Sequence, residues 1–252
     1  MNKKYTLVAN WKMQLPYNQA KELCSTYQQL NLTHNHTSTI VVCPSFETLS
    51  YAAQTLPQKG FSLGAQTCST HKTGAYTGDV SAQSLAQLGC SYCIIGHSER
   101  RMHQGETSHD VATKMLRLLE HGIHPIICIG ETEHEHHQGL TVHTLHEQLE
   151  PVIQALVHTT THPTILIAYE PIWSIGSGNV PTRDYLTKIF TWLDQLCTTL
   201  MPNVRCKLLY GGSVDEKNSK DIASVDHVHG FLVGGASLDF QKFKNIVSLI
   251  SE

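Results

Sequence analysis

The chain has 252 residues, of which 40% are hydrophobic and 15% are charged, and its formal net charge is −3. This composition is typical of a globular protein with one large buried core. With so small a net charge, no global field attracts nucleic acid or a membrane surface, so any site for an anion must be built locally. We expect a single domain over residues 1–252, because barrels of about 250 residues commonly form one domain.

The first residues show no sign of an export signal. Met1-Asn2-Lys3-Lys4 leads directly into a short apolar segment, without the longer apolar core and the cleavage site of a signal peptide. No stretch approaches the roughly 18 apolar residues that a membrane span requires. We therefore expect a cytoplasmic protein.

Two residue types invite a metal or redox interpretation. Cys90 and Cys93 form a C-x-x-C pair, and five histidines lie close together at positions 134, 136, 137, 143 and 146. The cysteines lack a second pair, and Cys93 begins an apolar run, which favours a packing role. The histidines lack the H-E-x-x-H spacing that places two ligands on one helical face. We expect a solvated helix there, with only accidental affinity for transition metals, and a true metal site is the less favoured alternative.

Short apolar, β-branched runs alternate with longer amphipathic segments along the whole chain. Eight strands are predicted, at residues 5–8, 39–42, 61–63, 92–95, 125–129, 164–168, 205–209 and 230–233. Helical patterns lie between them, for example at residues 18–30, 110–121, 142–157 and 183–200. Such alternation is typical of parallel β/α units. Eight units in this length, without a Gly- or Ser-rich linker, favour a closed, eight-stranded parallel (β/α)8 barrel of the α/β class.

An open, dinucleotide-binding sheet is the main alternative fold. Its first strand normally ends in a glycine-rich turn. Here the first predicted strand ends in Ala9-Asn10-Trp11-Lys12, which contains no glycine, so this alternative is disfavoured.

In a closed barrel, reactive groups belong at the carboxyl ends of the strands. The first predicted strand is followed by Asn10 and Lys12, in a short loop with apolar neighbours. The fourth is followed by His97, at the start of a short helical turn whose dipole favours a neutral imidazole. The sixth is followed by Glu170, and partial desolvation at the end of an apolar strand makes a carboxylate a better base.

Three further loops have a functional pattern. Gly211-Gly212-Ser213 and Gly234-Gly235 follow the last two strands, where such barrels bind phosphate through backbone N–H groups. Residues 171–181 place apolar side chains between a proline and two glycines, a pattern that predicts a lid over the site. The long connection from Gln66 to Val80 has no clear periodicity, and loops of that length are usually functional or contact a partner.

Seven segments, in the same order along the chain, resemble the triosephosphate isomerase family. They are A-N-W-K-M at 9–13, G-A-Y-T-G at 74–78, I-I-G-H-S-E-R-R at 94–101, C-I-G-E at 128–131, A-Y-E-P-I-W-S-I-G-S-G at 168–178, Y-G-G-S-V at 210–214 and L-V-G-G-A-S-L at 232–238. The resemblance covers essentially the whole chain. It implies a TIM barrel that interconverts dihydroxyacetone phosphate and D-glyceraldehyde 3-phosphate, in glycolysis and gluconeogenesis, without cofactor or metal.

The resemblance also implies residue roles, which are those established for the family and do not follow from the pattern alone. Glu170 matches the general base, His97 the electrophile that polarises the carbonyl, and Lys12 the ammonium that anchors the anionic substrate. The substrate contacts of the family are matched by Asn10, Gly176, Ser213, Gly234 and Gly235. Glu99 matches a group that supports Lys12. Thr77 matches the tip of a loop that is inserted into the second subunit of a homodimer.

Four positions depart from the family pattern. Ala9 replaces a common glycine, Thr67 a frequent asparagine, Asn179 a common lysine and Asp215 a common asparagine. None of them removes a group with an implied catalytic role, so we expect effects on the turnover rate rather than on the reaction.

Two other functions remain open. One is a different phosphate-binding barrel enzyme, such as a lyase or synthase acting on a larger sugar phosphate, which needs a roomier pocket and another acid/base set. The other is a non-enzymatic barrel that binds a partner. Loss of Lys12, His97 or Glu170 would favour the second function, and all three residues are present.

Overall fold

Eight parallel strands close into a barrel in chain order, with β1 paired to β8, so the predicted fold class is confirmed. The computed structural model describes the chain except for residues 1–3, 31, 33–37, 158–161, 177–178 and 251–252. The strands are β1 (Thr6–Asn10), β2 (Thr39–Cys43), β3 (Ser62–Ala65), β4 (Cys90–Ile95), β5 (His124–Ile129), β6 (Thr164–Tyr169), β7 (Arg205–Tyr210) and β8 (Gly230–Val233).

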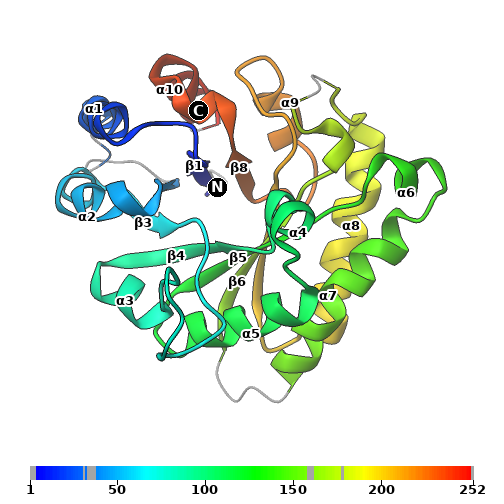
Figure 1. Cartoon of the computed structure of the whole chain (residues 1–252). Helices are drawn as coiled ribbons and strands as arrows, with labels where there is room; N and C mark the ends of the chain where they lie inside the picture. The colour runs from blue at the N-terminus through cyan, green and yellow to red at the C-terminus, as the bar shows by residue number, and fades with distance from the viewer. Residues whose placement is uncertain (1–3, 31, 33–37, 158–161, 177–178, 251–252) are drawn as a thin grey trace.

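The helices surround the strands as an outer ring (Figure 1). They are α1 (Tyr17–Tyr27), α2 (Phe46–Thr55), α3 (Ala82–Gln87), α4 (Ser98–Gln104), α5 (Ser108–Leu119), α6 (Glu133–His137), α7 (Thr141–Val157), α8 (Arg183–Leu200), α9 (Ser219–Ala223) and α10 (Phe240–Leu249). Four short 3-10 helices complete the described elements: η1 (Gln28–Leu30), η2 (Pro57–Lys59), η3 (Ile172–Ser174) and η4 (Gly235–Leu238).

The predicted elements are all found, with shifted ends. The first helix was predicted to run to Leu30, but its α-helical part ends at Tyr27 and continues as a tighter 3-10 turn. Asn10 was expected to follow the first strand, yet it is the last residue of β1 because it still pairs with Cys43 of β2. This pairing fixes the direction in which the Asn10 side chain leaves the barrel wall.

The core has two layers, because successive side chains of a strand point to opposite faces. Val8, Val41, Ile94, Ile126, Leu166 and Leu209 belong to a cluster inside the barrel. Their neighbours Leu7 and Ala9, with Ile40 and Ile95, pack outward against the helices in a larger cluster. The filled interior gives the strand ends a rigid platform, on which loop residues can be held in fixed positions.

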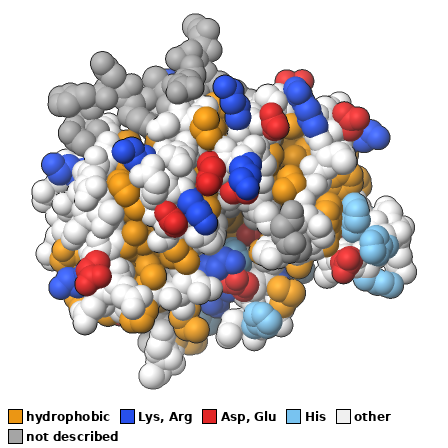
Figure 2. Space-filling view, turned by 90° about the horizontal axis from the view of Figure 1, so that it is seen from above, with side chains coloured by type: hydrophobic (Ala, Val, Ile, Leu, Met, Phe, Trp, Pro, Cys, Tyr) orange, Lys and Arg blue, Asp and Glu red, His pale blue; other side chains and the backbone are white. Residues whose placement is uncertain are grey.

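Cys90 and Cys93 are both buried, whereas the histidine-rich segment lies at one edge of the molecule. All eight cysteines are free, and burial raises the pKa of Cys90 to about 12 and that of Cys93 well above its ordinary value. Figure 2 shows histidine side chains gathered at one edge of the molecule, on the side where Figure 1 places α6. The histidine-rich segment contains two helices, α6 and the start of α7, with Gly139 between them.

Within the described residues, no group of three or more His, Cys, Asp or Glu side chains is arranged to hold a metal ion. No helix in the described part of the chain combines the length and the apolar character that crossing a membrane requires.

Candidate active site

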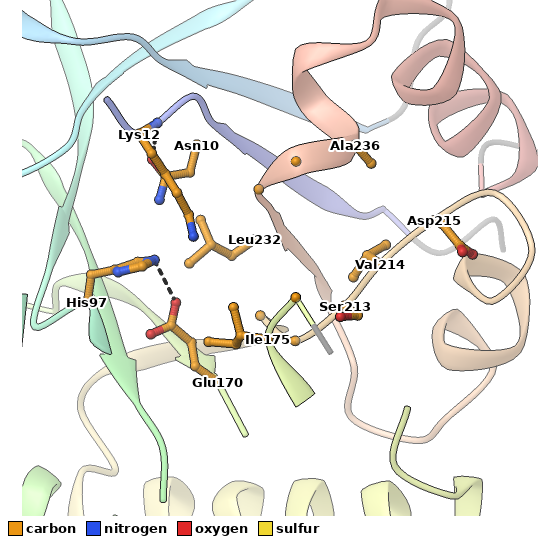
Figure 3. A pocket seen from close by; sticks show the side chains of 15 residues that line it. Asn10, Lys12, His97, Glu170, Ile175, Ser213, Val214, Asp215, Leu232 and Ala236 are labelled. Carbon is orange, nitrogen blue, oxygen red and sulfur yellow. Dashed lines mark hydrogen bonds and ion pairs between the residues drawn. The ribbon is translucent and has the colours of Figure 1, made fainter. Parts of the chain in front are cut away.

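A pocket of about 250 Å³ opens at the carboxyl ends of the strands. Figure 3 shows side chains and backbone from widely separated loops converging on it. Eight residues singled out in the sequence line this pocket: Asn10, Lys12, His97, Glu170, Gly176, Ser213, Gly234 and Gly235. The barrel therefore brings together residues from five different strand ends.

The side chains of Glu170 and His97 point toward each other and are in contact at one end of the pocket (Figure 3). Glu170 directly follows β6 and is only 1% exposed, and its Oε1 lies 3.2 Å from Nε2 of His97. Its Oε2 accepts a hydrogen bond of 3.0 Å from the backbone N–H of Ser98, the first residue of α4. Both carboxylate oxygens are thus held by groups of the loop after β4.

The contacts of His97 define which of its nitrogens carries the proton. His97 caps α4, and its Nδ1 accepts the backbone N–H of Glu99 at 3.2 Å. An Nδ1 that accepts a hydrogen bond has no proton, so the ring is neutral and the proton is on Nε2. That N–H points at Glu170 and into the pocket, where it is able to donate to an oxygen atom of a ligand.

Lys12 supplies the positive charge of the pocket. Its Nζ lies 2.6 Å from Oε1 of Glu99. Partial burial would raise the pKa of Glu99, but the hydrogen bond and charge of Lys12 lower it below its ordinary value. Glu99 therefore stays ionised as a partner for the ammonium.

The backbone of Lys12 is fixed by two side chains. Its N–H donates to Oδ1 of Asn10 at 3.0 Å, and its carbonyl accepts from Nε2 of Gln66 at 2.8 Å. Gln66 also donates to the carbonyl of Cys43 at 3.0 Å. These bonds hold Lys12 at a φ of 52°, in the left-handed region that non-glycine residues rarely adopt.

The opposite side of the pocket consists mostly of backbone. The loop from Gly211 to Asp215 and the start of η4 both line it. No side-chain atom shields the backbone at Gly235, where a Cβ would meet nothing within 4 Å. Exposed N–H groups in glycine-rich loops and at helix starts favour anions such as phosphate.

The lid segment (Pro171–Gly176) lies against this backbone. The carbonyl of Ser174 accepts from Oγ of Ser213 at 2.6 Å, and Ile175 and Gly176 line the pocket. Trp173 donates from Nε1 to Oε1 of the fully buried Glu131 at 2.8 Å. The predicted lid runs to residue 181, and its residues 177–178 lie outside the described part of the chain.

Comparisons with known proteins agree with this geometry. The sequence profile of the family Triosephosphate isomerase matches residues 5–250. The chain belongs to the triosephosphate isomerase family. Triosephosphate isomerase of Aquifex aeolicus is 37% identical over 243 residues, which cover 96% of this chain and 97% of the relative. Those of Ralstonia nicotianae and Thermus thermophilus are each 38% identical over 240 residues, 94% of this chain and 95% of the relative.

The remaining residues singled out by their likeness to triosephosphate isomerases do not line the pocket. Glu99 lines a neighbouring hollow that also includes Met13 and Phe46. Thr77 is exposed on the long connection and does not line the pocket. Of the departures from the family pattern, Asp215 lines the pocket but directs its Oδ1 to the N–H groups of Lys217 and Asn218, at 2.8 and 3.0 Å.

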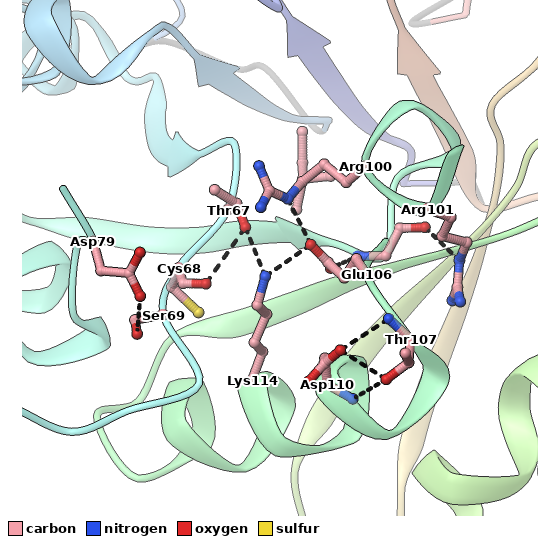
Figure 4. A network of polar contacts seen from close by, with 12 residues as sticks. Thr67, Cys68, Ser69, Asp79, Arg100, Arg101, Glu106, Thr107, Asp110 and Lys114 are labelled. Atoms are coloured by element: carbon pink, nitrogen blue, oxygen red, sulfur yellow. Dashed lines mark hydrogen bonds and ion pairs between the residues drawn. The ribbon is translucent and has the colours of Figure 1, made fainter. Parts of the chain in front are cut away.

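A buried ionic network supports the loop after β4 (Figure 4). Glu106 accepts from the Gly96 N–H at 2.7 Å and from Nζ of Lys114 at 2.8 Å, and it also pairs with Arg100. Lys114 donates further to Oγ1 of Thr67, at the position where the family commonly has asparagine. The hydroxyl thus accepts the bond that an amide oxygen would accept.

Several residues of the site were missed in the sequence. Gln66, Ser98, Glu106 and Glu131 all act by holding another residue rather than by facing the pocket. The only sequence signal for Gln66, Ser98 and Glu131 was their position, either within a family-like segment or beside a strand end. For Glu106 no local signal exists, since its partners are brought together by the fold.

Proposed function

We propose that this chain interconverts dihydroxyacetone phosphate and D-glyceraldehyde 3-phosphate by proton transfer through an enediol(ate), in glycolysis and gluconeogenesis. The observation that carries the proposal is the buried Glu170–His97 pair, set opposite a glycine-rich backbone surface in one small pocket. A base and a hydrogen-bond donor at one end and an anion site at the other suit a three-carbon phosphate. Family membership supports the same reaction.

The proposed mechanism assigns the carbon-bound proton to Glu170. Its carboxylate takes a proton from the carbon beside the carbonyl, and the electron pair forms the carbon–carbon double bond of the enediolate. Glu170 then returns the proton to the neighbouring carbon. A positioned base of this kind contributes about 10²–10⁴ in rate.

The negative charge that develops on oxygen is assigned to His97, Lys12 and Asn10. Nε2–H of His97 donates to the carbonyl oxygen, gives up its proton to it and takes the proton of the adjacent hydroxyl. Each such donor contributes roughly 10²–10³ in rate, because it points in advance to the place where the charge appears. The backbone at Gly176, Ser213, Gly234 and Gly235 binds the phosphate, and Glu99 keeps Lys12 in place.

We further propose that the protein is a homodimer. Residues 71–79 of the long connection are all exposed, and Met13, beside Lys12, is 94% exposed. A hollow lined by Met13, Phe46 and Glu99 opens beside the pocket, where the loop carrying Thr77 of a second copy would cover it. The cytoplasmic location and the single domain expected from the sequence stay predictions.

The test is a coupled isomerase assay with glyceraldehyde 3-phosphate on the wild type and on Glu170→Gln. We expect wild-type turnover, and a loss of at least about 10²-fold in kcat in the variant with nearly unchanged affinity for a phosphate ligand. Near-wild-type turnover of Glu170→Gln would refute the assignment of the base. An inactive wild type that binds a larger sugar phosphate would favour the other barrel enzyme. An inactive wild type that binds no sugar phosphate would favour the non-enzymatic barrel.

A further inference from the structure

His136 of α6 is in direct contact with the lid segment. Its imidazole stacks on the indole of Trp173, with ring centroids 4.4 Å apart and planes at 26°. The edge of the ring faces Tyr185 of α8, whose hydroxyl lies 3.2 Å from Nδ1. The same Nδ1 lies 3.6 Å from Oε1 of Glu131, the oxygen to which Trp173 donates. Nothing in the proposed mechanism uses His136.

The hydroxyls of this cluster allow Nδ1 of His136 to carry a proton. The hydroxyls of Tyr169 and Tyr185 both donate to Oε1 of Glu131, at 3.0 and 3.1 Å. Burial raises the pKa of both tyrosines, which therefore remain neutral donors. With the Tyr185 proton directed to Glu131, the Tyr185 oxygen is available to accept from Nδ1–H of His136.

The charge of Glu131 favours an imidazolium over a neutral ring. Glu131 is fully buried, and its other oxygen, Oε2, has no hydrogen-bond partner among the described residues. Within that part of the chain, His136 is the only basic side chain within 4 Å of this carboxylate. A buried carboxylate surrounded only by neutral donors is costly, and a positive charge at His136 offsets that cost.

We propose that protonated His136 is a positioning residue that holds the lid segment against the pocket through Trp173 and Glu131. The titratable groups in contact with it are Glu131 from the β5–α6 loop, Tyr185 from α8 and His137 from its own helix. Tyr169 from β6 bonds to the same Glu131 and Tyr185. A cation over an aromatic face and next to a buried carboxylate keeps Trp173 in place. As pH rises and the imidazole loses its charge, both contacts weaken and the lid segment is held less firmly.

The proposal rests on the isomerase function, because its main readout is the affinity for the triose phosphate. KM and the release of inorganic phosphate from the enediol intermediate are measured from about pH 6 to about pH 9 in the wild type, His136→Gln and His136→Arg. Gln cannot be charged, whereas the Arg guanidinium is planar, stacks on aromatic rings and stays charged throughout. Titration of the substrate phosphate is common to all proteins and cancels in the comparison.

At low pH we expect wild type and His136→Arg to have the same KM, and His136→Gln a KM about threefold higher with more phosphate released per turnover. At high pH the wild type should approach His136→Gln while His136→Arg stays low. His134→Gln, an exposed neighbour on α6, should follow the wild type. Equal profiles for wild type and His136→Gln, or an Arg variant that behaves like the Gln variant, would overturn the proposal.

A second measurement tests the contact without any activity. The fluorescence of Trp173, obtained as the difference from Trp173→Phe, should fall as the stacked imidazole becomes protonated, and His136→Gln should lose this pH dependence. A signal of Trp173 that is independent of pH in the wild type refutes the inference about His136. An inactive wild type that keeps the fluorescence change refutes the isomerase function alone.

Discussion

At the scale of single residues, Lys12 combines an active position with an unfavourable backbone conformation. Its φ of 52° costs an L-residue about 1 kcal/mol, and the bonds from Asn10 and Gln66 hold it there. The conformation directs the ammonium towards Glu99 and the pocket, since Nζ lies 2.6 Å from Oε1 of Glu99. Stability does not account for a lysine at this position, which agrees with the proposed role of Lys12 in binding the anionic substrate.

Lys12→Gly should therefore separate stability from activity. Glycine adopts a positive φ without strain, so we expect the free energy of unfolding to stay unchanged or to rise by up to about 1 kcal/mol. The ratio kcat/KM should fall at least about 10²-fold, because the ammonium is lost. Urea unfolding and the coupled assay measure the two quantities. As a control, Lys21→Gly within α1 should lower the free energy of unfolding by about 1 kcal/mol. An equal loss in Lys12→Gly would contradict the interpretation.

Most pocket-facing residues were predictable one by one, because strand ends carry the reactive groups of a barrel and glycine pairs mark phosphate loops. Glu170, His97 and Lys12 are examples. The residues that hold them were not, and Gln66 shows why. Its amide bonds to carbonyls of residues 12 and 43, which come close only when β1, β2 and β3 are side by side.

At the scale of elements, the buried carboxylate of Glu106 joins the end of β4 to α4 and α5. Burial alone would raise the pKa of Glu106, but Lys114, Arg100 and the Gly96 N–H together lower it below its ordinary value. A lowered pKa means that the folded state favours the ionised form. This stabilisation is present above the ordinary pKa of a carboxyl and is lost as pH falls through the lower pKa of the folded state.

Glu106→Gln is expected to lower the free energy of unfolding by about 3 kcal/mol near pH 7, since Lys114 is left buried without its partner. The difference from wild type should shrink as pH falls below about 4, where the wild-type carboxylate also loses its charge. Urea titrations near pH 7 and pH 3 measure this difference. Glu147→Gln, a change at an exposed glutamate of α7, should alter stability by less than about 0.5 kcal/mol. A difference that does not depend on pH would show that packing, not charge, holds the network.

At the same scale, strands were easier to predict than the short helices. Buried strands of a parallel sheet appear as continuous apolar runs, whereas α6 has only five residues and no buried face. Thr132 and Glu135 form a capping box that starts α6, and Gly139 adopts a φ of 71° just after it. The histidine-rich segment is divided there into α6 and α7 because glycine favours this left-handed conformation.

For the whole molecule, the count of eight β/α units predicted closure of the barrel, whereas only the family resemblance indicates which surfaces of two copies meet. The proposed homodimer depends on an exposed loop that Lys72 joins to Glu120, just after α5, through an ion pair of 3.1 Å. His71 and Tyr76 stack on each other within it, with ring centroids 3.6 Å apart. The loop therefore has its own shape before any partner binds, which lowers the entropy cost of association.

Thr77→Glu tests the homodimer directly. Placing a carboxylate at the exposed tip of this loop should oppose its burial in a second subunit, because an unpaired charge is costly to desolvate. Sedimentation at micromolar concentration should then show a dimer for the wild type and mainly monomer for the variant, with a lower kcat/KM in the monomer. Thr199→Glu adds the same charge at an exposed position of α8 and should leave the dimer intact. A wild type that sediments as a monomer, or a Thr77→Glu protein that remains dimeric, would contradict the proposed role of the loop.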